Sequence, residues 1–202
     1  MHPNILNKNQ TQLLPLIEKF SNQFYLVGGT AIALHLGHRR SIDFDLFSYT
    51  NFDNQKILKI TKQFWPIQDL FLDSQDELTI IINKVKITWY NYPYKINCSS
   101  NLQNVIKLPN LVTLAAMKAY ALGRRAKWKD YVDLYFIFQK HSLEEVVKTT
   151  QKIFKNEFNQ KLFREQLAYH QDIDYSEPIE YFAKTHPSNQ VIKRKLTDIS
   201  LS

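Results

Sequence analysis

Hydrophobic residues follow two different spacings along the chain, and the change between them divides the sequence into two parts. Strand-like runs or alternations cover residues 24–27, 42–47, 67–72, 77–82 and 85–92. Helical spacing appears between them at residues 10–23, 30–36 and 52–64. Beyond Pro93 only helical spacing remains, at residues 109–125, 128–139, 143–154 and 159–169. A strand-rich part is therefore followed by a helical part.

The pattern predicts an α/β (α+β) fold, a mixed sheet with flanking helices and then a C-terminal helical half. We expect residues 1–107 to form the sheet-containing core and residues 108–202 to complete one side of a cleft. The pair Asn83-Lys84 predicts a hairpin between its two neighbouring strands. The stretch after Gln171 contains two prolines and many polar residues, so we expect it to be loosely packed.

A glycine pair gives the first indication of chemistry. The apolar run Phe24–Val27 stops at Gly28 and Gly29, which is typical of a buried strand ended by a tight turn. A helix is expected next, with Thr30 as its N-cap and Gly37 at its end. Glycine lets the backbone approach a phosphate closely, and the first amides of a helix favour an anion.

Two carboxylates follow on the next strand. Asp43 and Asp45 are two residues apart, so a strand presents both on one face. Paired hard oxygen ligands suit Mg²⁺, which takes one or two carboxylates together with phosphate oxygens and water. The glycine turn and the carboxylates together predict a Mg²⁺ nucleoside triphosphate site.

The order of these features resembles the nucleotidyltransferase superfamily, in which a Gly-Gly or Gly-Ser turn precedes an Asp-x-Asp strand. The segments that carry the resemblance are YLVGGTAIALHLGHRRSIDFDLF and, for the narrower AbiEii branch with its MenT toxins, LAAMKAYALGRRAKWKDYVDLYFI. The resemblance implies an NTP-using toxin neutralised by a cognate antitoxin. The residues it implies are Gly28, Gly29, Thr30 and Ser41 for nucleotide contact, Asp43 and Asp45 for the metal, and Lys118 and Asp130 for catalysis.

The second segment also supports this interpretation from its own residues. Lys118 and Arg125 share a helical face in the predicted helix, so both cations can point toward a triphosphate. Their role would be to neutralise charge that develops on phosphate oxygens. Asp133 lies in apolar surroundings and needs a partner, either Arg124, Arg125 or a capping bond.

Three alternatives stay open at the level of the sequence. Many superfamily members carry a third carboxylate on a later strand, but residues 85–90 contain none. The general base is therefore Asp130 or Asp45, or the metal alone activates the acceptor. Arg39 and Arg40 either hold phosphates or pair at the surface. The aromatic run Trp89–Tyr94 either stacks on a base or packs in the interior.

Charge bears on the acceptor. The 202-residue chain has 26 Lys and Arg against 19 Asp and Glu, a net charge of +7, which favours polyanionic partners. An RNA acceptor is predicted, most specifically a tRNA 3′ end. The alternatives are an enzyme whose acceptor is a protein or an antibiotic-like small molecule, and a catalytically silent module. The sequence has no membrane-length apolar run and a single cysteine, so we expect a cytoplasmic protein without membrane association.

Overall fold

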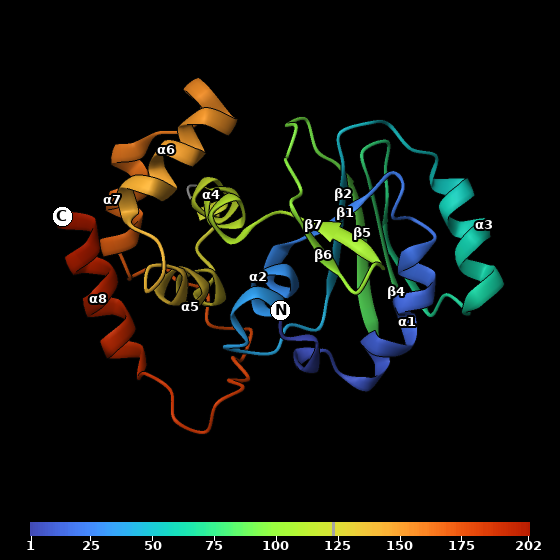
Figure 1. Ribbon diagram of the computed structural model, residues 1–202, viewed down its shortest axis with the longest axis horizontal. Helices are drawn as coiled ribbons and strands as arrows, with labels where there is room; N and C mark the ends of the chain where they lie inside the picture. Colours follow the sequence, from blue (N-terminus) through green and yellow to red (C-terminus); the bar gives the residue numbers. More distant parts are fainter. Residues whose placement is uncertain (123) are drawn as a thin grey trace.

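A computed structural model describes residues 1–122 and 124–202, and its sheet and its later helices lie side by side (Figure 1). The five-stranded sheet has the order β1-β2-β5-β4-β3, in which β2 and β5 are parallel and the other neighbours antiparallel. Its strands are β1 Tyr25–Val27, β2 Phe44–Ser48, β3 Asp69–Asp73, β4 Glu77–Ile82 and β5 Val85–Asn91. The predicted mixed sheet is confirmed.

Three helices accompany this sheet. Helices α1 (Lys8–Glu18) and α3 (Asn54–Phe64) lie on the side away from the helical half, whereas α2 (Gly28–Leu36) lies between the sheet and that half (Figure 1). Asn7 and Gln10 form a capping box at the start of α1, and a short 3-10 helix, η1 (Pro3–Ile5), precedes it. Because of this position, α2 contacts both the sheet and the helical half.

Two hairpins complete the strand-rich half. Asn83 and Lys84 have φ values of 49° and 61°, the left-handed pair that a two-residue turn requires, so the predicted hairpin is confirmed. A second hairpin, β6 (Ser100–Leu102) with β7 (Ile106–Leu108), was not predicted. Three-residue strands are too short to show a period, and β7 is held by packing against β1.

The second half consists of helices, as predicted. They are α4 Leu111–Leu122, α5 Trp128–Ile137, α6 Leu143–Phe154, α7 Gln160–Ala168 and α8 Asn189–Leu201, with the 3-10 turn η2 Lys155–Glu157 after α6. The expectation that the first of these helices reaches Arg125 is wrong, because α4 ends at Leu122 and Arg125 lies in the connection to α5.

The expectation of loose packing after Gln171 is wrong for α8, whereas most side chains between residues 174 and 191 are exposed, as expected. Helix α8 packs against α5 and α7, and its Ile192 and Leu196 are 0% exposed. Before it, residues 172–182 form an extended strap that pairs with both halves of the molecule, through the bridges Lys127 to Asp174 and Arg39 to Tyr181. Hydrophobic burial and these backbone bonds order a stretch whose composition suggested the opposite. Within the described residues, no helix is long and apolar enough to cross a membrane.

Candidate functional site

The glycine turn touches the carboxylate strand directly. Gly28 has a φ of +71°, and a Cβ added there would lie 1.9 Å from Oδ2 of Asp45, so this position requires glycine for both conformation and space. Strand pairing explains the proximity, because Val27 is the register partner of Asp45. The turn and the carboxylate thus form one continuous surface.

Thr30 has a different role from the predicted cap. Helix α2 begins at Gly28, so Thr30 lies inside it, and its buried Oγ1 donates to the backbone oxygens of Asp43 and, at 3.3 Å, Ser41. The prediction of an N-cap at Thr30 is therefore wrong, because the glycine pair itself forms the first helical turn. Thr30 holds the loop that leads into β2.

Gly29, Ser41 and Arg39 meet on the other side of the turn. A Cβ on Gly29 would lie 2.7 Å from Nη2 of Arg39 and 2.9 Å from Oγ of Ser41. Arg39 is buried, and its Nε and Nη2 donate to the two carboxylate oxygens of Asp133 at 2.7 and 2.8 Å. Neither alternative for Arg39, free phosphate contact or surface pairing, describes this buried bidentate ion pair.

Asp43 and Asp45 occupy the end of the sheet beside this turn. Asp45 is the second residue of β2, whereas Asp43 lies one residue before the strand, and Nζ of Lys86 is 3.2 Å from its Oδ2. Burial, and then the charge of Asp43, raise the pKa of Asp45 above its ordinary value of 3.8. A bound cation would relieve both effects, so the two carboxylates fit a divalent metal.

This metal site would be open. Among the described residues, no group of three or more His, Cys, Asp or Glu side chains could enclose an ion. Two carboxylates leave the remaining coordination positions to phosphate oxygens and water, which is the arrangement that Mg²⁺ commonly adopts.

A buried network of charges lies behind the turn. Nζ of Lys118 in α4 is 2.6 Å from Oδ1 of Asp130 and 3.0 Å from Oδ2 of Asp133, both in α5. Arg39 completes the pairing of Asp133, and Nε2 of His38 lies 2.8 Å from the same carboxylate. Asp133 therefore joins α5 to α4 and to the loop after α2.

The partners of Asp133 differ from those expected. Arg124 does not reach it, and Arg125 instead donates from Nε to Oδ2 of Asp130 at 3.1 Å. The sequence did not identify Arg39 as the partner of Asp133, because the two residues are separated by 94 positions. The only signal was the need of a buried carboxylate for a cation, which names no particular partner.

The network favours the charged forms of Arg39, Lys118, Asp130 and Asp133. Burial opposes the charge on each group, but Arg39 and Lys118 hold the pKa of Asp133 well below 3.8. Burial is likewise outweighed at Asp130, whose pKa is lowered by Lys118 and Arg125, and at Lys118, whose pKa is raised by the two aspartates. Lys118 is therefore a permanent cation.

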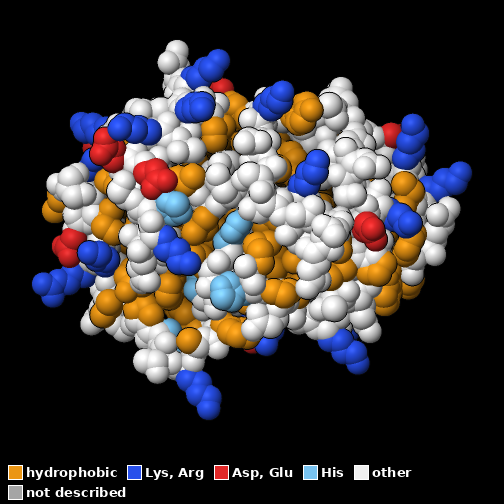
Figure 2. Space-filling model, in the orientation of Figure 1, with side chains coloured by type: hydrophobic (Ala, Val, Ile, Leu, Met, Phe, Trp, Pro, Cys, Tyr) orange, Lys and Arg blue, Asp and Glu red, His pale blue; other side chains and the backbone are white. Residues whose placement is uncertain are grey.

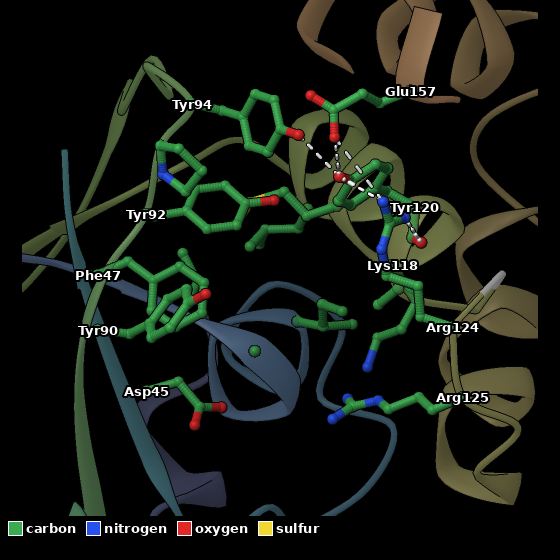
Figure 3. Close-up of a pocket in the computed structure, with 17 residues that line it drawn as sticks. Asp45, Phe47, Tyr90, Tyr92, Tyr94, Lys118, Tyr120, Arg124, Arg125 and Glu157 are labelled. Carbon is green, nitrogen blue, oxygen red and sulfur yellow. Dashed lines mark hydrogen bonds and ion pairs between the residues drawn. The ribbon is translucent and has the colours of Figure 1, made fainter. Parts of the chain in front are cut away.

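These elements surround one cavity of about 540 Å³ (Figure 3). At its charged end the carboxylate of Asp45 faces Lys118 and Arg125, and Gly28 also lines the cavity. The other end is mainly aromatic and is lined by Phe47, Tyr90, Tyr92, Tyr94 and Tyr120. A cavity of this size accepts a nucleotide.

The predicted residues thus divide into two groups. Gly28, Asp45, Lys118 and Arg125 line the cavity itself. The others do not line it: Thr30, Arg39 and Asp130 support it from behind through the contacts given above, Gly29 adjoins Ser41, and Asp43 adjoins Lys86. The aromatic end was an open alternative in the sequence, and Arg124, which also lines it, was not predicted as a site residue.

Sequence comparison gives two independent matches. Residues 16–68, which contain the glycine turn and both carboxylates, match the family model described as nucleotidyl transferase AbiEii toxin, Type IV TA system. The chain is also 32% identical to the uncharacterized protein aq_aa25 of Aquifex aeolicus (strain VF5) over 163 residues, which is 75% of this chain and 77% of that protein.

Solved structures share the fold. MenT4, a nucleotidyltransferase toxin from Mycobacterium tuberculosis H37Rv, has a TM-score of 0.60 at 15% identity and covers 95% of this chain and 80% of its own. JHP933 from Helicobacter pylori has a TM-score of 0.53 at 17% identity and covers 81% and 74%. These structures show the shared fold alone, whereas the family model covers the glycine turn and both carboxylates, and the chain belongs to the AbiEii family of nucleotidyltransferase toxins.

Proposed function

We propose that this nucleotidyltransferase moves a nucleoside monophosphate from an NTP to a hydroxyl of RNA, with a tRNA 3′ end as the acceptor. One observation carries the proposal. Within a single cavity that Gly28 also lines, the carboxylate of Asp45 faces the cations of Lys118 and Arg125. A triphosphate with its metal would place a cation beside the carboxylate and phosphate oxygens beside the two cations.

Each residue has a role that follows from its position. Lys118, kept charged by Asp130 and Asp133, would stabilise the negative charge that develops on the phosphate oxygens, assisted by Arg125. Gly28 and Gly29, at the first turn of α2, would present backbone amides to the phosphates, with Ser41 beside them. Thr30 and Arg39 support this surface from behind.

Asp43 and Asp45 would hold Mg²⁺. The ion would neutralise phosphate charge when bound, as it does in other phosphoryl transfer enzymes. Lys86 already pairs with Asp43, so this lysine would neutralise part of the charge of the two carboxylates and the ion would neutralise the rest. Since no third carboxylate of the described residues joins them, Asp130 or Asp45 remains the candidate base for the acceptor hydroxyl.

The RNA acceptor is supported by the net charge of +7. Figure 2 shows Lys and Arg side chains spread over the visible face, with few acidic groups among them. Such a surface attracts a polyanion without fixing its sequence. We further propose that residues 1–107 act as the catalytic core and residues 108–202 complete the cleft, that the protein works in the cytoplasm, and that a cognate antitoxin neutralises it.

The test is an incubation of the protein with each α-labelled NTP, Mg²⁺ and total cellular RNA, in which RNA and protein are then separated. We expect label on RNA of tRNA size, and no label with Asp45→Asn. The matched control is Asp198→Asn, which alters a carboxylate in α8, outside the cavity. Label confined to protein, or to an aminoglycoside-like small molecule supplied in a parallel reaction, would overturn the RNA acceptor.

A catalytically silent nucleotide-binding module is the alternative from another class, and the lack of a third strand carboxylate in residues 85–90 permits it. Binding of NTP with Mg²⁺, without label on RNA, protein or small molecule, would support that alternative. A substitution at Lys118 tests the enzyme further. If the unaltered chain labels an acceptor, Lys118→Met should abolish that label, because no other described lysine is held between the two buried aspartates.

A further inference from the structure

At the aromatic end of the cavity, the ring of Tyr120 lies between Phe154 and Arg124. Tyr120 of α4 lies parallel to the buried ring of Phe154, with centroids 3.9 Å apart and an angle of 3° between planes. The Arg124 guanidinium carbon is 3.7 Å from the centroid of the same Tyr120 ring. Two groups this close cannot share one side of a ring, so Phe154 and Arg124 cover opposite faces of Tyr120.

Hydrogen bonds hold Arg124 over this ring, with the guanidinium directed toward the Tyr120 hydroxyl. Its Nη2 donates to the Tyr120 hydroxyl at 2.7 Å and its Nη1 to the Tyr120 backbone oxygen at 3.3 Å. The Tyr120 hydroxyl donates to Oε2 of Glu157 at 2.9 Å, so the 2.7 Å contact with the Tyr94 hydroxyl is one in which Tyr94 donates. The guanidinium is therefore fixed in position before any ligand arrives.

The outer surface of this guanidinium is available. The Arg124 side chain is 53% exposed and lines the same cavity as Asp45 and Lys118. The opposite wall is formed by Tyr90 and Tyr92 of the sheet side (Figure 3). Within residues 1–122 and 124–202, neither of these two hydroxyls has a hydrogen-bond partner, although Tyr92 is only 8% exposed.

Arginine planes and aromatic rings are the groups on which nucleobases stack, and unpaired hydroxyls can bond to the polar edge of a base. The charged end of the cavity would take the triphosphate, so a base attached to it falls at the aromatic end. We propose that the nucleobase of the donor NTP stacks on Arg124, with the Tyr90 and Tyr92 hydroxyls along its edge. This proposal rests on the proposed function.

Binding measurements separate stacking from charge. The affinities of ATP, CTP, GTP and UTP and of inorganic tripolyphosphate, each with Mg²⁺, are measured by calorimetry on the full chain and on Arg124→Lys. Lysine keeps the positive charge and loses the plane. We expect the affinity for the best NTP to fall at least about fivefold, the lower end of one stacking interaction, with tripolyphosphate changed less than about twofold.

Lys161→Ala, a cation 87% exposed on α7, is the matched control and should leave every affinity unchanged. Tyr120→Phe keeps the stack but removes the hydroxyl that orients Arg124, and it should weaken the NTP alone by a smaller factor. Thermal unfolding of each variant confirms that it is folded.

Equal weakening of the NTP and tripolyphosphate in Arg124→Lys would mean that Arg124 contacts phosphate, and it would overturn the subsite. An unchanged NTP affinity would overturn it as well. If neither an NTP nor tripolyphosphate binds the unaltered chain, the proposed function itself fails, and the subsite fails with it. If tripolyphosphate binds as tightly as every NTP, the triphosphate site stands and the base subsite is rejected.

Discussion

Asp133→Asn should destabilise the protein far more than any substitution at the surface. The change keeps the shape of the side chain and removes one negative charge from a residue that is 0% exposed. The buried charges of Arg39 and Lys118 are balanced by Asp130 and Asp133. The variant leaves one positive charge in the interior without a counter-ion, and an amide NH₂ group now faces donors.

The expected loss follows from that imbalance. Removing one partner of a buried ion pair costs about 3–5 kcal/mol, because the remaining charge stays desolvated. Domains of this size are stable by about 5–15 kcal/mol, so the loss is a large part of the total. Asp130→Asn should cost less, about 2 kcal/mol, because Arg125 is 51% exposed and Lys118 retains Asp133.

Urea unfolding followed by far-UV circular dichroism measures the free energy of unfolding of the three proteins by linear extrapolation. Lys161→Ala serves as the surface control and should be indistinguishable from the unaltered chain. A loss below about 1 kcal/mol for Asp133→Asn would refute the role of the network, since that is the range of an exposed pair. A larger loss for Asp130→Asn than for Asp133→Asn would also refute it.

Three further outcomes are expected. Gly28→Ala should abolish NTP binding with Mg²⁺ in calorimetry, because its Cβ would collide with Asp45 at 1.9 Å, and retained binding would show that the turn does not contact the nucleotide. Leu196→Ala should lower the free energy of unfolding, measured in urea, by about 2–5 kcal/mol. A negligible change would mean that the C-terminal stretch is loosely packed after all. Burial lowers the pKa of His38 below 6.5, so the unfolded chain binds a proton that the native chain does not bind. The free energy of unfolding should therefore fall as pH drops below 6.5. His38→Gln should make that fall shallower from about pH 7 to about pH 5.5, and an unchanged slope would contradict the assignment.

Local patterns determined how much of the fold could be predicted. Helix α6 and strand β4 have the predicted bounds, because each combines a strong period with polar flanking residues; Ser142 caps the first residues of α6. The hairpin at Asn83 depends on two adjacent residues only. Family and fold class followed from the glycine turn and carboxylates, which lie close together in the sequence between Gly28 and Asp45.

Features that depend on distant residues were not predictable. The polar sequence of α8 becomes a helix because Ile192 and Leu196 find partners on α5 and α7. Arg39 was predicted either to hold a phosphate or to pair at the surface, because its actual partner Asp133 lies 94 positions away. The stack on Tyr120 likewise joins α4 to α6, which no single periodic pattern contains.

The strap of residues 172–182 links site assembly to the order of synthesis. Arg40 donates its backbone N–H to Glu180 at 2.8 Å, and Phe182 donates to His38 at 3.0 Å. The loop that carries Arg39 and Ser41 therefore reaches its final backbone bonds only with residues made much later. Because a growing chain emerges from the ribosome with its N-terminus first, the sheet can form while this loop still lacks the two backbone bonds to the strap. The loop beside the proposed nucleotide site therefore cannot make both of these backbone bonds until residue 182 has been synthesised.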